Sequence, residues 1–137
     1  MGNGSVIMTD TTFDYTVDVD TRLITLRLFG REPSAHYADK IIELYRAVPD
    51  LWRYNRVVDH RKFRGLIVLD DLKRMSEVWN EVNQGHTVQT RVAFLTRSAL
   101  TQARVNAHSS IFPGQNRRTF TNVAEAMTWV LEPATLT

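Results

Sequence analysis

Three adjacent residues, Asp59, His60 and Arg61, are of types that could do chemistry together. A carboxylate, an imidazole and a guanidinium together can transfer a proton, bind an anion or simply face solvent. They follow the apolar pair Val57 and Val58, as expected where a strand leaves a core. Neighbouring side chains on a strand point to opposite faces, so Asp59 and His60 would diverge if the strand ran through them. The pattern therefore favours a binding loop over a catalytic pair.

A second polar stretch, at residues 96–98, follows the apolar run VAFL in the same way. In open α/β sheets ligands bind beyond the carboxyl ends of parallel strands, and arginines next to helix starts favour an anion. The sequence thus predicts a binding surface made of Asp59, His60, Arg61, Arg64, Thr96, Arg97 and Ser98. We expect Asp59 to organise its own loop by accepting from nearby amides or pairing with an arginine. His60, Arg61 and Arg64 are expected to face solvent.

Other chemistries leave no positive signal. The chain has no cysteine, and its four histidines include no pair four residues apart. Neither of the two common phosphate-binding glycine motifs, Gly-x-x-x-x-Gly-Lys and Gly-x-Gly-x-x-Gly, occurs in the sequence. No metal, cofactor or catalytic residue is therefore predicted. Basic residues interleave with aromatic ones between Arg53 and Arg64, which is typical of nucleic-acid surfaces. A strand divides this cluster and should send its two halves to opposite ends of a sheet, so nucleic acid is not the predicted partner.

Length and composition indicate one globular domain. The 137 residues carry a net charge of +2, and the positive excess lies in the second half of the chain, which favours an anionic partner. We expect a flexible tail at 1–10, with Met8 as an alternative start to Met1, then a single domain at 11–132 and a second tail at 133–137. The lack of cysteine and of a long apolar run predicts a cytoplasmic protein without membrane insertion.

Alternation of apolar and polar residues predicts an antiparallel hairpin over 13–20 and 23–29, and further strands near 56–59, 90–95 and 118–120. Helical spacing follows Ser34, Asp70, Ser98 and Asn122, and Ser34, Ser98 and Asn122 are expected to cap their helices. The order β-β-α-β-α-β-α-β-α predicts a mixed, mostly parallel five-stranded sheet with about four helices.

The segments FDYTVDVDTRLITLRLFG, RYNRVVDHRKF, RVAFLT and NVAEAMTWVL together resemble the SpoIIAA-like branch of the STAS family, from about Phe13 to Leu131. The resemblance implies a STAS-type sheet in a regulatory or ligand-binding module. In anti-sigma-factor antagonists the strand-exit Asp, matched here by Asp59, precedes a phosphorylated Ser. Residues 60–75 contain no Ser, Thr or Tyr, so we expect no phosphoswitch there. The same fold group is compared with lipid-carrying Sec14-like domains.

Three functions follow as alternatives. The first is a non-enzymatic module that recognises a protein partner or a small anionic ligand at the strand ends. The second is a carrier or sensor of a small apolar or lipid-like ligand, and the third is an enzyme that uses Asp59, His60 and Arg61. A deep apolar cavity would favour the carrier, a shallow polar surface the partner module, and convergent titratable groups the enzyme. The sequence does not decide between a monomer and a homodimer.

Overall fold

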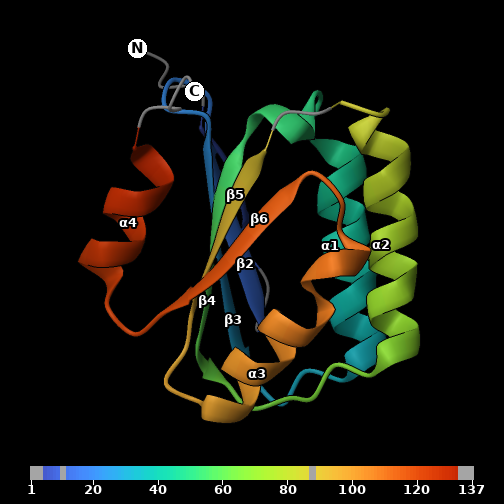
Figure 1. Cartoon of the computed structure of the whole chain (residues 1–137), viewed down its shortest axis with the longest axis vertical. Coiled ribbons are helices and arrows are strands. Elements are labelled where there is room, and N and C mark those ends of the chain that lie inside the picture. The colour runs from blue at the N-terminus through green and yellow to red at the C-terminus, as the bar shows by residue number, and fades with distance from the viewer. Residues whose placement is uncertain (1–4, 10–11, 87–88, 133–137) are drawn as a thin grey trace.

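One mixed sheet organises the molecule, a computed structural model that describes residues 5–9, 12–86 and 89–132 (Figure 1). Its strands lie side by side in chain order, antiparallel from β1 to β3 and parallel from β3 to β6. Their bounds are β1 Ser5–Thr9, β2 Phe13–Asp18, β3 Leu23–Gly30, β4 Asn55–Phe63, β5 Thr90–Leu95 and β6 Gln115–Phe120. The predicted hairpin and the mostly parallel sheet are confirmed.

The sheet has one strand more than the sequence predicted. Residues 5–9, expected to belong to a flexible tail, form β1, whose backbone pairs antiparallel with β2. Val6 and Ile7 have high strand propensity, but residues 5–9 show no alternation of apolar and polar residues that would reveal a strand. Pairing with β2 decides the conformation of this segment.

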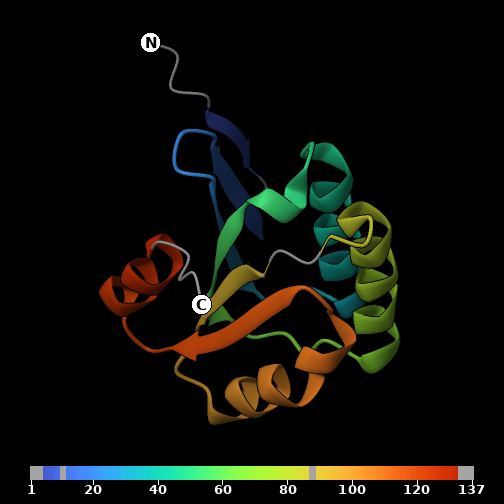
Figure 2. The ribbon, with the colours of Figure 1, turned by 45° about the horizontal axis from the view of Figure 1, so that its top comes forward.

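Helices cover both faces of the sheet (Figures 1 and 2). Helices α1 (Ser34–Ala47), α2 (Leu69–Asn83) and α3 (Ala99–His108) lie on one face, and α4 (Val123–Leu131) lies on the other. Short 3₁₀ turns at Leu51–Arg53 and Ser109–Ile111 complete the connections. Among the described residues, no helix has the length and apolar character needed to span a membrane.

The α4 face carries a small apolar core. Alternate residues of β3, β4 and β5 point towards α4, and the cluster consists of Leu23, Val57, Ala93, Leu95, Ala126, Trp129 and Val130. The opposite set of alternate residues points towards α1, α2 and α3. That second set includes Arg56 and His60 of β4 as well as apolar side chains, so this face combines a core with buried polar groups.

Two of the three predicted helix caps are confirmed. Ser98 Oγ accepts from the Thr101 amide at 3.2 Å, and Asn122 Oδ1 accepts from the Glu125 amide at 3.1 Å. The prediction for Ser34 is wrong, because the extended Pro33 occupies the cap position and Ser34 already lies inside the helix.

Ser34 instead joins the start of α1 to the segment that leads into α2. Its hydroxyl donates to Asp71 Oδ2 at 2.6 Å and accepts from the Val68 amide at 2.9 Å. The loop 64–68 is thereby attached to α1 at one end and continues from β4 at the other. This attachment positions one wall of the cavity described below.

Replacing Ser34 by Ala should lower the free energy of unfolding by about 1–2 kcal/mol, because two hydrogen bonds are lost and the Val68 amide loses its acceptor. Urea denaturation measures the change. Ser110→Ala, at an exposed serine, is the matched control and should stay within about 0.5 kcal/mol of the parent. Equal stability of the two variants would contradict the attachment.

Candidate functional site

A cavity of about 530 Å³ lies between the sheet and helices α1, α2 and α3. Its apolar wall consists of Leu26, Ile41, Val58, Leu72, Met75, Val92, Phe94, Val105 and Phe112. It reaches solvent at the C-terminal ends of the parallel strands, where Arg64, Leu66, Arg97 and Leu100 form an exposed rim. Pockets of this size and lining typically enclose a small organic ligand.

The polar lining of the cavity has a single sign of charge. It contains the six arginines Arg56, Arg61, Arg64, Arg97, Arg104 and Arg117 and the two histidines His60 and His108. No Asp or Glu occurs among the described residues that line it. Within the described ranges no group of His, Asp and Glu is arranged to hold a metal ion. The lining is therefore suited to an anion.

Arg56, from β4, is the most deeply buried of these cations, with 2% of its surface exposed. Its guanidinium lies over the rings of Tyr45 and Trp79, 5.1 Å from each ring centre. Neither Nη1 nor Nη2 has a hydrogen-bond partner, and no carboxylate of the described chain lies within ion-pair distance. Burial lowers the pKa of Arg56, although the nearby Tyr45 opposes this effect.

Arg117, from β6, is held in the same way. Its guanidinium lies 4.3 Å from the Phe112 ring centre and 4.6 Å from that of Phe94, and its buried Nε and Nη1 have no partner. Burial lowers the pKa of Arg117 to about 10, and the positive charge of Arg56 acts in the same direction. Two cations that repel each other therefore share one enclosed space.

His60 lies inside the molecule, so the prediction that it faces solvent is wrong. Strand β4 continues to Phe63, and alternation along the strand turns His60 to the same face as Arg56 and Val58. Its side chain lies beside Tyr37, with 2.8 Å between Nε2 and the Tyr37 hydroxyl, while Nδ1 is buried without a partner. Burial, and then the charge of Arg117, lower the pKa of His60 to about 4.

Asp59 points away from the cavity and is paired with Arg61. Its carboxylate accepts from the Arg61 amide at 3.0 Å and from Nε and Nη2 of the same side chain at 2.9 and 2.7 Å. The predicted pairing is confirmed, although it forms within the strand and not in a loop. Burial opposes ionisation of Asp59, but the hydrogen bonds and charge of Arg61 outweigh burial and lower its pKa.

Six of the seven predicted site residues line this one cavity: His60, Arg61, Arg64, Thr96, Arg97 and Ser98. Thr96 is buried and accepts from the Ser98 amide at 3.0 Å, which shapes the turn into α3. Asp59 is the exception. The structure thus brings the two strand exits together, and their role in binding stays a prediction.

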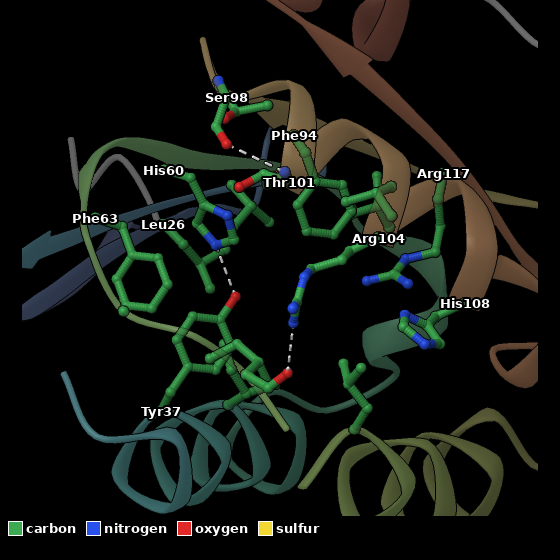
Figure 3. A pocket seen from close by; sticks show the side chains of 18 of the residues that line it. Leu26, Tyr37, His60, Phe63, Phe94, Ser98, Thr101, Arg104, His108 and Arg117 are labelled. Carbon is green, nitrogen blue, oxygen red and sulfur yellow. Dashed lines mark hydrogen bonds between the residues drawn. The ribbon is translucent and has the colours of Figure 1, made fainter. Parts of the chain in front are cut away.

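Sequence reasoning missed the cations farther inside, Arg56, Arg104 and Arg117, together with Tyr37 and His108. Figure 3 shows Arg104 reaching across the pocket from α3, where its Nη1 donates to the Ile67 carbonyl at 3.4 Å. The alternation of Arg56, Val58 and His60 along β4 was the available signal. Arg117 and Arg118 are adjacent in sequence, and only the strand register shows that Arg117 is the inward one.

Comparison with known proteins gives a relation at the level of the fold. No protein-family model matches the sequence, and no curated protein matches it significantly. A solved structure of an uncharacterised DUF3478-family protein with a SpoIIAA-like fold, from Shewanella loihica PV-4, superposes with a TM-score of 0.54. The match covers 93% of this chain and 92% of that chain at 14% identity, so it concerns the fold alone. The SpoIIAA-like fold predicted from the sequence is confirmed.

His60→Gln should remove a pH dependence of stability. The pKa of His60 lies below its unfolded value, so the unfolded chain takes up the proton first, and stability is lost as pH falls from about 6.5 towards 4. The loss in the parent amounts to about 3 kcal/mol over this range. Urea denaturation across the range, with each protein referred to its own value near about pH 8, measures the difference. Parallel pH profiles would contradict the assignment.

Arg56→Met should leave the stability of the ligand-free protein unchanged or raise it by up to about 2 kcal/mol, because a buried charge without a counter-charge is replaced by an apolar chain of similar length. Thermal and urea unfolding check the sign. A loss of about 3–5 kcal/mol is the signature of a broken buried ion pair and would contradict this view.

Proposed function

We propose that this protein is a non-enzymatic SpoIIAA-like module that binds a small organic anion with an apolar body in its interior cavity. One observation carries the proposal: Arg56 is buried, the Nε and Nη1 of the half-buried Arg117 are buried as well, and no described carboxylate pairs with either guanidinium. This reading joins two of the alternatives from the sequence, the small anionic ligand and the apolar ligand.

The energetics of burial support an anion. Transferring a guanidinium from water into a protein interior costs several kcal/mol, which a protein normally recovers with a paired carboxylate and further hydrogen bonds. The aromatic rings under Arg56 and Arg117 return roughly 0.5–2 kcal/mol each. A bound anion would supply the missing charge and hydrogen-bond acceptors in a space where electrostatic attraction is only weakly screened.

The rest of the lining supports an apolar body. Aliphatic and aromatic side chains from β3, α1 and α2 line the same cavity as the two arginines. A ligand whose anionic group meets these arginines would contact the apolar wall with the rest of its surface. An inorganic ion would leave the wall uncovered, whereas a ligand with a hydrocarbon portion would fill it.

The catalytic alternative has no support from the geometry. Asp59 and His60 point to opposite faces of β4, and Arg61 turns back to Asp59 and not towards His60. No shared space brings the three groups to one substrate atom, which general acid–base catalysis requires.

A protein partner at the rim is the second candidate. Leu66, Val68, Leu69 and Leu100 are all about half exposed, and Arg64 and Arg97 lie among them. Exposed apolar side chains beside arginines are typical of protein contacts. This candidate places recognition on the surface and not in the cavity.

A fluorescent amphipathic anion, anilinonaphthalene sulfonate, tests the cavity. It should bind the native protein at one site, and Arg117→Met should weaken binding at least about tenfold because a buried charge-assisted contact is lost. The matched control is Arg118→Met, at the next residue on the opposite face over Phe120 and Trp129, which should leave affinity unchanged. Near-ultraviolet circular dichroism verifies that both variants are folded.

The double variant Arg61→Ala/Arg97→Ala, at one strand-exit arginine and one rim arginine, separates the two candidates. Both arginines are exposed, so their removal should change cavity binding only modestly, and less at high salt. If the rim variant abolished probe binding while Arg117→Met and Arg118→Met behaved alike, the cavity proposal would be wrong and a surface site would be favoured.

A further inference from the structure

The inner part of the cavity has a defined floor. Arg56 pairs in parallel register with Val92, and Val92 pairs with Arg117. All three side chains line the cavity, so they form a row across β4, β5 and β6 on the face of the sheet that α1, α2 and α3 cover. Adjacent strands lie about 4.8 Å apart, which places the two arginine backbones about 10 Å apart with one short side chain between them. We call these three residues the arginine row.

Further unpaired nitrogen atoms surround the arginine row. Gln115 Nε2 from β6, and Arg104 Nε and His108 Nδ1 from α3, are buried without hydrogen-bond partners. In Figure 3 the side chains of Arg104, Arg117 and His108 extend into the same part of the pocket. A ligand group at this position would meet more nitrogen atoms than the two oxygens of a carboxylate can engage.

The charge of the arginine row distinguishes between anions. A monoanion could compensate Arg56 or Arg117, and the other guanidinium would remain buried with its positive charge. A phosphate monoester carries nearly two negative charges at neutral pH and presents three acceptor oxygens. Arginine forks bind such oxygens in pairs. The charge therefore favours the phosphate group over both a carboxylate and a sulfate, and the number of acceptor oxygens also favours it over a carboxylate.

We infer that the arginine row is the binding site for a phosphate monoester head group, whose apolar tail lies along Leu26, Val58 and Phe94 towards the rim. This inference rests on the proposed function and narrows its ligand class. The distance along β4 from Arg56 to His60, four residues, is about 13 Å, which leaves room for a chain of medium length.

Titration of n-alkyl phosphates with hexyl, octyl and decyl chains, followed by calorimetry, tests the head group. The best of the three should bind at least about tenfold more tightly than the alkyl sulfate of the same length, which is a monoanion. Octanol and inorganic phosphate, each with half of the chemistry, should bind more weakly than octyl phosphate.

The pH dependence gives a second readout. Affinity for the alkyl phosphate should rise about tenfold from about pH 5 to about pH 7.5, because the second phosphate pKa lies near 6. The titratable and charged side chains that face the arginine row are Tyr37 and Tyr45 from α1, His60 from β4, and Arg104 and His108 from α3. The alkyl sulfate, which does not titrate in this range, reports any change that these protein groups cause.

Variants locate the head group. Arg56→Met and Arg117→Met should each weaken alkyl phosphate binding at least about thirtyfold, whereas Arg118→Met should not. Equal affinity and equal pH profiles for phosphate and sulfate would overturn this inference and leave the proposed anion-binding function intact. Alkyl phosphate binding that survives both Met variants would overturn the placement. Absence of binding for every alkyl anion would overturn both proposals.

Discussion

The character of the cavity depends on one unusual electrostatic constraint. The guanidinium groups of Arg56 and Arg117 lie on the face of the sheet that α1, α2 and α3 cover, without a carboxylate among the described residues around them. Aromatic rings lie close to the guanidinium groups of Arg56 and Arg117, but a ring offers no strong hydrogen-bond acceptor to their N–H groups. The fold thus keeps cationic hydrogen-bonding capacity unused in its interior. Such capacity is costly for stability and useful for recognition.

Well-packed regions elsewhere in the fold offset the free-energy cost of burying the two guanidinium groups. The α4 face carries an apolar cluster that includes Val57, Ala93 and Trp129, and the face covered by α1, α2 and α3 is apolar over β2 and β3, where Phe13, Tyr15 and Leu26 are buried. Trp79 of α2 is fully buried and donates from Nε1 to the Pro113 carbonyl at 2.6 Å, which ties α2 to the segment before β6. The polar region is therefore confined to β4–β6 and bounded by well-packed elements.

The SpoIIAA-like fold is shared with a protein that is only 14% identical, so the fold by itself does not identify a ligand. In this chain β4 continues beyond Val58 as far as Phe63. Asp59 pairs with Arg61 outside the cavity, and the side chain of His60 points inward and contacts the Tyr37 hydroxyl. The strand exit that resembles a regulatory loop in sequence thus becomes, in this molecule, part of the cavity wall.

The sequence by itself determined the features that depend on short-range interactions. These are the hairpin, the order of strands and helices from Phe13 onward, the caps Ser98 and Asn122, and the pairing of Asp59 with an arginine two residues away. Each follows from local periodicity or from a hydrogen bond within a few residues, so no knowledge of the rest of the chain was needed.

Tertiary structure alone decided the rest. Strand β1 exists because β2 pairs with it, and Ser34 bonds to Val68 and Asp71 because α1 and α2 pack together. Arg56 and Arg117 lie 61 positions apart in the sequence. They face one cavity because the parallel register places both beside Val92. A shift of one residue in either strand would turn its arginine to the α4 face, and periodicity within a strand cannot specify the register between strands.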